Sequence, residues 1–191
     1  MGGSSLVKGK HPLRSRTTAG RFLLLTLLLM VAFYSALYQP YSEQSLPGRL
    51  LVAHLELVAR ASGGVLQLLG EPVSVQGTSV SGRFPYLVVL DCAALDAQAL
   101  FAAAVLAFPV RLRPKLLGLA GGLVLIALLN VGRLVLLYFA GVHSERLFQV
   151  LHEEVMVLLI ILAVCGLFVS WARWALRQTP QPSQLEPEHA T

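Results

Sequence analysis

Long apolar runs separated by short basic turns constrain this chain more than any other feature. Hydrophobic residues make up 55% of its 191 residues and charged residues only 13%. A soluble domain is about a quarter charged, whereas a bilayer-crossing helix needs about 20 mostly apolar residues. We therefore expect an all-α membrane protein that forms one polytopic domain.

Four of the apolar runs are predicted to be transmembrane helices: residues 22–38, 93–110, 116–140 and 152–176. The flanking composition divides the chain into three predicted parts: a basic cytoplasmic tail at 1–21, a polytopic membrane domain at 22–177 and a disordered cytoplasmic tail at 178–191.

Two segments between the first and second runs are predicted to lie outside the hydrocarbon. Residues 50–69 carry Glu56, Arg60 and Gln67 on one helical face, which favours an interfacial amphipathic helix over a fifth span. Residues 72–80 alternate in polarity and break at Gly77, as a short β-hairpin does. Unpaired strand edges are not tolerated in hydrocarbon, so we expect this hairpin to be extracytoplasmic.

The distribution of charge predicts the orientation of the helices. With the N-terminus in the cytoplasm, four spans put ten of the fifteen basic residues on the cytoplasmic side, as the positive-inside rule requires. A fifth span at 50–69 would move the basic turn at 111–115 outside and break that rule. We therefore expect a multi-pass protein of the bacterial inner membrane with 39–91 and 141–151 on the periplasmic side. Because the basic residues lie at helix ends, the expected partner is membrane lipid and not nucleic acid.

Three polar residues are predicted to meet at the extracytoplasmic face. Cys92 begins the second span, His152 begins the fourth, and Arg133 lies about 10 Å below the outer end of the third. A thiol, a fixed cation and an imidazole suit acyl transfer, because they supply a nucleophile, a charge stabiliser and a general acid–base. Asp91 is expected to cap the second helix, which would put the Cys92 thiol in its first turn, where the helix dipole favours a thiolate.

Each of these residues also has a structural interpretation. Cys92 is of a type that often packs as a small apolar side chain, and His152 suits a hydrated helix end. Arg133 could pair with Asp96 or Glu153, but an arginine inside a span is costly and by default indicates function. We expect Asn130, three residues before Arg133 on the same face, to support the site. Asp96, one turn after Cys92, is expected to orient His152 or to pair with Arg133.

The order of these elements resembles the exosortase/archaeosortase family of membrane transpeptidases, in particular its short exosortase H-like members. The shared pattern is a glycine-punctuated hairpin, a cysteine at a helix start, an Asn-x-x-Arg near the outer end of the next helix and a histidine that opens the last. Here it runs through Gly77, Cys92, Asn130–Arg133 and His152, within residues 68–176. The family usually follows its cysteine with Ser-Gly or Asn-Gly, where this chain has Ala93-Ala94.

The resemblance implies a cysteine protease or transpeptidase that cleaves C-terminal sorting signals of exported proteins through a thioester. Such a signal consists of a short motif, a transmembrane helix and a basic cluster. Cys92 would be the nucleophile, Arg133 would stabilise the thiolate or the oxyanion, and His152 would shuttle protons. We expect no metal or cofactor, because the chain has no CxxC and its five histidines are scattered. The alternative is a catalytically idle assembly or anchoring subunit whose polar residues form a structural network.

Overall fold

The computed structural model describes residues 13–42 and 44–178, so residues 1–12 of the predicted tail at 1–21 and residues 179–191 of the predicted tail at 178–191 lie outside the described residues. Helix α1 begins at Leu13, inside the segment that the sequence predicts to be a tail. Along the chain the elements are α1(Leu13–Leu37), α2(Leu46–Leu68), β1(Ser74–Gln76), β2(Ser79–Ser81), β3(Tyr86–Leu87), η1(Leu90–Cys92), α3(Leu95–Ala107), α4(Leu112–His143), α5(Glu145–Val150), the π-helical turn η2(Leu151–Val155) and α6(Met156–Arg177).

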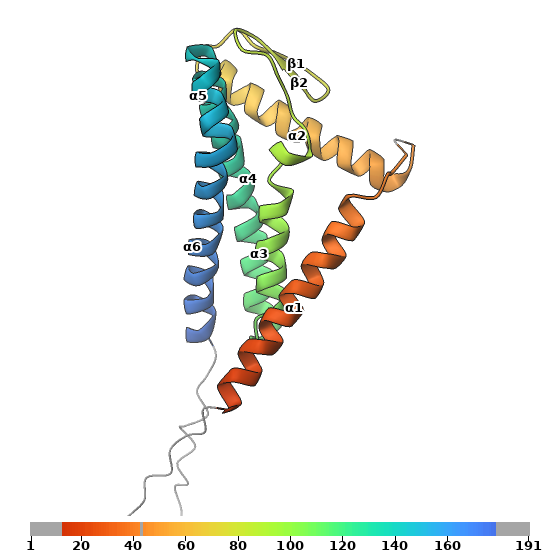
Figure 1. Ribbon diagram of the computed structural model, residues 1–191, viewed down its shortest axis with the longest axis vertical. Coiled ribbons are helices and arrows are strands. Elements are labelled where there is room, and N and C mark those ends of the chain that lie inside the picture. Colours follow the sequence, from red (N-terminus) through yellow and green to blue (C-terminus); the bar gives the residue numbers. More distant parts are fainter. Residues whose placement is uncertain (1–12, 43, 179–191) are drawn as a thin grey trace, which may run out of the picture.

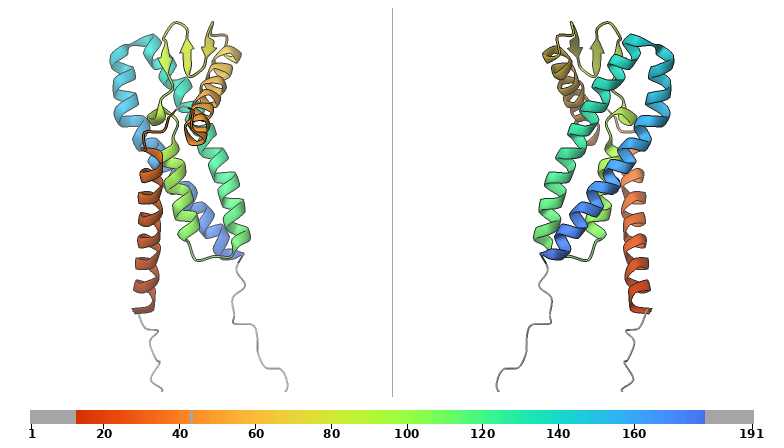
Figure 2. Two further views of the ribbon diagram at one scale, coloured as in Figure 1. Left: turned by 90° about the vertical axis from the view of Figure 1, so that its right-hand side faces the viewer. Right: turned by 90° about the vertical axis from the view of Figure 1, so that its left-hand side faces the viewer.

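The helices α1, α3, α4 and α6 run lengthwise through the molecule, and the remaining elements gather at one end of them (Figure 1). α1, α3, α4 and α6 form the long part, whereas α2 crosses one end obliquely with the strands beside it (Figure 2). We call this end, which also holds α5, the sheet end. The opposite end, where α3 turns into α4, is the turn end. Residues 44–91 and the connection between α4 and α5 therefore lie at the same end, as the sequence predicts.

Three helices of the described chain are long and apolar enough to cross a membrane: Ala19–Leu37, Leu112–His143 and Glu145–Arg177. The predicted mostly helical membrane fold is therefore confirmed, but the predicted number of four spans is not. The second predicted span, 93–110, contains only the 13-residue helix α3. At 1.5 Å per residue α3 is about 20 Å long, less than the hydrocarbon thickness of about 30 Å. A 3₁₀ turn precedes it, and extended Phe108 before Pro109 ends it.

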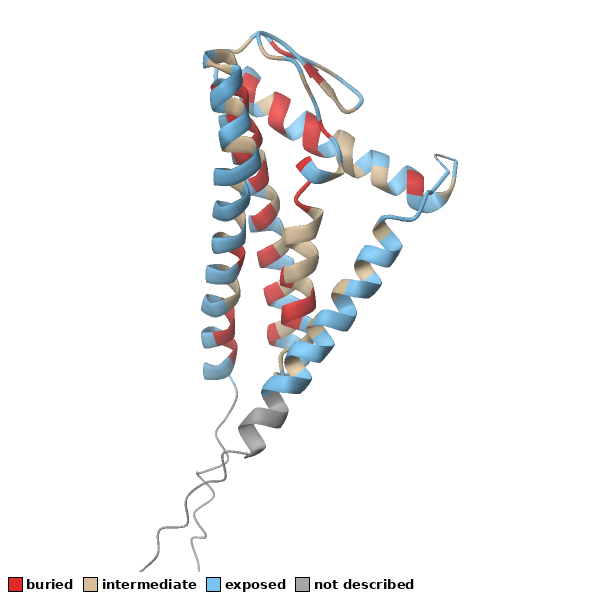
Figure 3. Ribbon diagram, in the orientation of Figure 1, coloured by how far each residue is buried: buried red, intermediate tan, exposed pale blue. Residues whose placement is uncertain are grey.

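Helix α2 has the two-sided character that the sequence predicts, and it is not among the candidate spans. Ser45 caps it by accepting a hydrogen bond from the Gly48 amide, with Pro47 in the first turn. One face buries Val58, Ala59 and Leu66 against the sheet and α4. The other face is exposed (Figure 3). The sheet therefore packs against the buried face of α2.

The predicted hairpin is present, and it is joined by a third strand. β1 and β2 pair antiparallel around Gly77, whose φ of +57° is readily adopted by glycine. β3 continues the sheet by pairing Tyr86 with Val80. A Cβ on Gly63 of α2 would lie 2.3 Å from a methyl carbon of Val75, so glycine is what lets the hairpin lie directly on α2.

Within the part of the chain that the structure describes, buried hydrophobic residues form two separate clusters, one at each end. The first joins α2, the sheet, η1 and α4, and it includes Val80, Val88, Leu134 and Tyr138. The second joins α3, α4 and α6: Phe101, Val105, Ile126, Val164, Trp171, Ala172 and Ala175. In contrast, α1 is exposed along most of its length (Figure 3). The first cluster surrounds Cys92, so packing at the sheet end determines where the thiol lies.

Candidate functional site

Cys92 lies at the end of a short 3₁₀ turn and not in the first turn of α3. The Val88 amide donates to the Thr78 carbonyl (2.9 Å) and fixes the chain to the hairpin just before η1. Asp91 lies inside η1 and makes no capping hydrogen bond there, and α3 begins only at Leu95. The expectation that Asp91 caps the helix and puts Cys92 in its first turn is therefore wrong. The hairpin and η1 position the thiol instead.

The turn between Cys92 and α3 is made by an alanine in a left-handed conformation. Ala94 has φ +53° and ψ +26°, and it is the one non-glycine residue of the described chain with a positive φ. A Cβ in this region costs about 1–2 kcal/mol. Glycine would adopt the same turn without this strain.

We expect Ala94→Gly to raise the free energy of unfolding by about 0.5–1 kcal/mol, because relief of the left-handed strain outweighs the greater chain entropy of glycine when unfolded. Thermal unfolding of the purified protein in detergent measures the change. Ala93→Gly is the matched control, because Ala93 has φ −88° and has no such strain to relieve. Equal destabilisation by both substitutions would contradict a strained turn at 94.

Asn130 holds the backbone of Cys92 against α4. Its side-chain Nδ2 donates to the Cys92 carbonyl oxygen (2.8 Å) across 38 residues of sequence. The side chain is fully buried, and its Oδ1 has no partner among the described residues. Asn130 therefore positions the residue that carries the thiol.

Arg133 lies one turn further along α4 with 8% of its surface exposed. Its Nε is buried without a partner, and the two ion pairs of the described chain, Glu56–Arg60 and Glu71–Arg83, do not include it. The ion pair of Arg133 with Asp96 or Glu153, which the structural interpretation requires, is therefore absent from the described residues. The guanidinium lies close enough to Cys92 and to His152 for a coulombic interaction with each of them.

His152 lies inside a helix that starts seven residues earlier than the sequence predicts. The chain is helical from Glu145, and His152 belongs to the π-helical turn η2 between α5 and α6. Such turns are rare and often occur at functional sites. The ring stacks on Phe148 of the preceding turn (centroids 5.3 Å apart, planes 6° apart), and Nδ1 is buried without a partner in the described chain.

Cys92 and His152 line one pocket of ≈310 Å³ at the sheet end. Its walls come from β3 and the residues around it, from α4, and from α5 with η2. They are mostly apolar: Phe84, Pro85, Tyr86, Leu87, Val89, Leu134, Leu137, Tyr138 and Phe148. A pocket with apolar walls, a thiol and an imidazole, beside an unpaired cation, can exclude water from an acyl group and strengthen charge interactions with it.

Asp96 does not lie with the other predicted site residues. Its carboxylate interacts with Tyr34 and Tyr38 near the end of α1, and it forms no ion pair with Arg133. The acidic residues that act on His152 are Glu153 and Asp91. The structure thus brings Cys92, Asn130, Arg133 and His152 together and leaves Asp96 facing α1.

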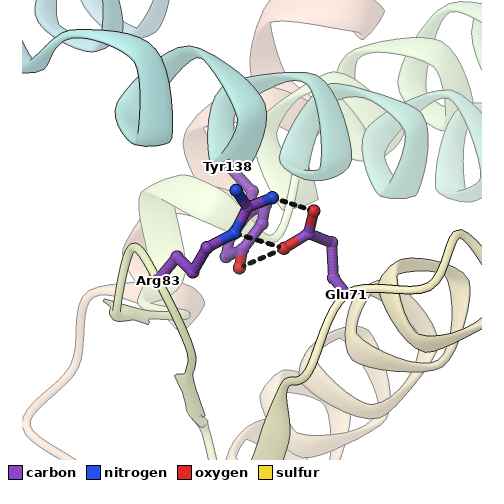
Figure 4. Close-up of polar contacts among 3 residues, drawn as sticks. All are labelled: Glu71, Arg83 and Tyr138. Atoms are coloured by element: carbon purple, nitrogen blue, oxygen red, sulfur yellow. Dashed lines mark hydrogen bonds and ion pairs between the residues drawn. The ribbon is translucent and has the colours of Figure 1, made fainter.

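A clamp that sequence reasoning missed holds one wall of the pocket (Figure 4). Arg83, after β2, forms a two-pronged ion pair with Glu71, which precedes β1, and its Nε lies 2.9 Å from Glu71 Oε2. The hydroxyl of Tyr138 on α4 donates to the same Oε2 (3.1 Å) while its ring lines the pocket. Glu71 and Tyr138 are 67 residues apart, so no local pattern could reveal the contact.

The clamp makes stability depend on pH in a defined direction. Hydrogen bonding from Arg83, aided by Tyr138, lowers the pKa of the Glu71 carboxyl from its ordinary value. The ionised Glu71 carboxylate therefore contributes fully to the free energy of unfolding above its unfolded-state pKa of about 4.3. This contribution is lost as the pH falls through the lower pKa of the folded state. We expect Glu71→Gln to lower the melting temperature at pH 7, and the difference from wild type to shrink below pH 4.

Glu56→Gln is the matched control for this pH series. The Glu56–Arg60 pair lies within α2 and is exposed, so its loss should cost only about 0.3–0.5 kcal/mol. If Glu71→Gln and Glu56→Gln had equal effects at pH 7, the clamp would contribute no more than a surface ion pair.

The fold and the pocket define a polytopic membrane protein with a cysteine, an arginine and a histidine gathered at one end of its helices. The family model described as transmembrane exosortase matches residues 15–171, and the chain therefore belongs to the exosortase/archaeosortase family. Archaeosortase A of Natronomonas pharaonis is 28% identical over 154 residues, which cover 73% of this chain and 48% of that protein. The chain spans about half the length of this relative. No solved structure matches it.

Proposed function

We propose that this chain is a membrane cysteine protease or transpeptidase that removes C-terminal sorting signals from exported proteins. Membership of the exosortase/archaeosortase family supports a membrane transpeptidase that acts in protein sorting. The substrate signal would consist of a short motif, a transmembrane helix and a basic cluster. The active site would lie at the sheet end, on the periplasmic side of a bacterial inner membrane.

The observation that carries this proposal is the shared pocket of Cys92 and His152 beside an unpaired guanidinium. Arg133 is buried with no carboxylate partner among the described residues, so its charge is available to a thiolate or to a reacting oxygen. His152 likewise has a buried ring nitrogen without a partner. Unsatisfied polar groups of this kind are costly unless a ligand or transition state uses them.

In the proposed reaction the Cys92 thiolate attacks the carbonyl carbon of the scissile peptide bond. A C–S bond forms, and Arg133 stabilises the thiolate or the oxyanion that develops. His152 gives its proton to the leaving amine as the C–N bond breaks, which releases the tail. An acceptor nucleophile then loses a proton to His152 and attacks the thioester, and Cys92 leaves as a thiolate.

Asn130 and Asp96 are assigned supporting roles of different kinds. Asn130 would hold the Cys92 backbone by its carbonyl, and would thereby keep the thiol close to Arg133. Asp96 would act at a distance from the pocket by joining the start of α3 to the tyrosines of α1. Neither residue would form or break a bond with the substrate.

The test is co-expression with an exported reporter that ends in a tripartite tail taken from the same genome. We expect the reporter to accumulate without its apolar helix only when this chain is present, as judged by the mass of its new C-terminus. A reporter whose short motif is scrambled but whose helix and basic cluster are intact is the matched control, and it should remain uncut. Equal cleavage of both reporters, or of neither, would contradict a sorting-signal peptidase.

One observation favours the alternative of an idle assembly or anchoring subunit: only 8% of the Cys92 surface is exposed. In that case the polar residues would form a structural network, and Cys92→Ser would be silent while loss of Arg133 would reduce folding or abundance. An enzyme should instead lose its activity with Cys92→Ser, and loss of Arg133 should leave its folding and abundance intact.

A further inference from the structure

A second pocket lies at the turn end, between the start of α4 and the end of α6. It has a volume of ≈500 Å³ and is lined by Arg111, Leu112, Arg113, Pro114, Leu117, Trp174 and Gln178. Leu117 is separated from Leu134, in the wall of the Cys92 pocket, by 17 residues of helix, which is about 25 Å along the axis. This second pocket is therefore distinct from the candidate active site.

The turn end is positively charged without compensation from the described residues. Its basic side chains are Arg21, Arg111, Arg113, Lys115, Arg173 and Arg177. The acidic residues of the described chain lie elsewhere, in α2, the sheet segment, η1, the start of α3, α5 and η2. Neither Arg111 nor Arg113 belongs to either ion pair of the described chain. Two unpaired guanidinium groups beside a concave apolar surface attract an anion.

The other walls of the pocket are mostly apolar, and three of their side chains face outward. Leu112 and Leu117 are 66% and 63% exposed, and Trp174 is 39% exposed. All three belong to helices that are long and apolar enough to cross a membrane. Exposed leucines on such helices contact acyl chains, and tryptophan prefers the level of the headgroups. The pocket thus combines a site for an anion with a surface for hydrocarbon.

We propose that this pocket binds an anionic phospholipid, with Arg111 and Arg113 on the headgroup phosphate and the acyl chains along Leu112 and Leu117. Arginine presents planar, forked donors that match phosphate oxygens. A zwitterionic headgroup would bring its ammonium group towards the surrounding basic side chains, so a lipid with net negative charge is preferred. The bound lipid would link the start of α4 to the end of α6.

The experiment measures retention of lipid by the full-length protein in detergent. Phosphatidylglycerol and phosphatidylcholine with identical chains are titrated, and bound lipid is counted by native mass spectrometry. We expect phosphatidylglycerol to bind at least tenfold more tightly. The double substitution Arg111→Gln/Arg113→Gln should weaken its binding by about 30-fold, at roughly tenfold per 1.4 kcal/mol and about 1 kcal/mol per arginine.

Arg21→Gln is the matched control, because Arg21 is basic and lies at the same end but outside this pocket. It should leave binding within twofold of wild type, and the double substitution to lysine should retain most of the binding. Unchanged melting temperatures in lipid-free detergent verify folding. Equal losses from Arg21→Gln and the double glutamine variant, or equal affinity for the two lipids, would overturn the proposal. Displacement of phosphatidylglycerol by millimolar inorganic phosphate would overturn it too, by revealing a small-anion site.

This proposal does not depend on chemistry at Cys92. Lipid binding is read out without substrate, so a protein that fails to cleave any reporter can still bind phosphatidylglycerol. Conversely, failure of lipid binding would leave the proposed peptidase activity untouched.

Discussion

Cys92→Ala is expected to abolish cleavage of the tripartite reporter, with a loss of at least about a thousandfold in rate. The carbon that replaces sulfur cannot attack a carbonyl, and no other thiol lines the pocket. Alanine is smaller than cysteine and leaves the hydrogen bond from Asn130 to the backbone carbonyl intact. The protein should therefore fold and accumulate normally. Quantifying intact and shortened reporter in the same cells measures the effect.

Cys165→Ala is the matched control for this substitution. Cys165 is the second free cysteine of the chain and is exposed on α6, away from the pocket lining. Its loss should leave cleavage unchanged. If Cys92→Ala cleaved at the wild-type rate, or if Cys165→Ala were as damaging, the thiol of Cys92 would have no part in the reaction.

Arg133→Met is expected to separate stability from activity. A buried guanidinium without an ion-pair partner in the described chain is costly, so an apolar chain of similar length should raise the free energy of unfolding by about 1–2 kcal/mol. The same change should reduce cleavage by about 10²–10³-fold, the typical effect of removing one donor that stabilises a developing oxyanion. Thermal unfolding and reporter cleavage are measured on the same preparation.

Arg60→Met is the matched control, since Arg60 is exposed on α2 and forms only a surface ion pair with Glu56. Its stability and activity should both stay close to wild type. Arg133→Lys should keep part of the activity, because it retains a charge but loses the forked geometry. A drop in melting temperature for Arg133→Met would instead favour the structural network of an idle subunit.

Local signals in the sequence were sufficient for much of the fold. Gly77 between two alternating segments predicted the hairpin, and the polar face of 50–69 predicted that α2 is not a span. The spacing of Asn130 and Arg133 predicted that they share a face of α4, and both are buried. These inferences rest on periodicities of a few residues, which the backbone geometry of helices and strands fixes directly.

The predictions from sequence failed where contacts between distant segments, or strain in the backbone, determine the structure. Hydrophobicity alone extends the second span back to residue 93, whereas the left-handed Ala94 delays the start of α3 to Leu95. The link between Glu71 and Tyr138 and the π-helical turn around His152 depend on packing between segments far apart in sequence. Nothing in the spacing of these residues encodes such contacts.

Trapping an acyl-enzyme on Cys92 is the most direct test of whether this thiol is the nucleophile. The full-length protein is incubated with a reporter and quenched in acid, and the peptide containing Cys92 is weighed by mass spectrometry. We expect an added mass equal to the shortened reporter, joined to the Cys92 thiol as a thioester through its new C-terminal carbonyl. Hydroxylamine should remove this mass, and Cys165 should never carry it. Cleavage with that peptide always unmodified, or with the acyl group on another residue, would contradict it.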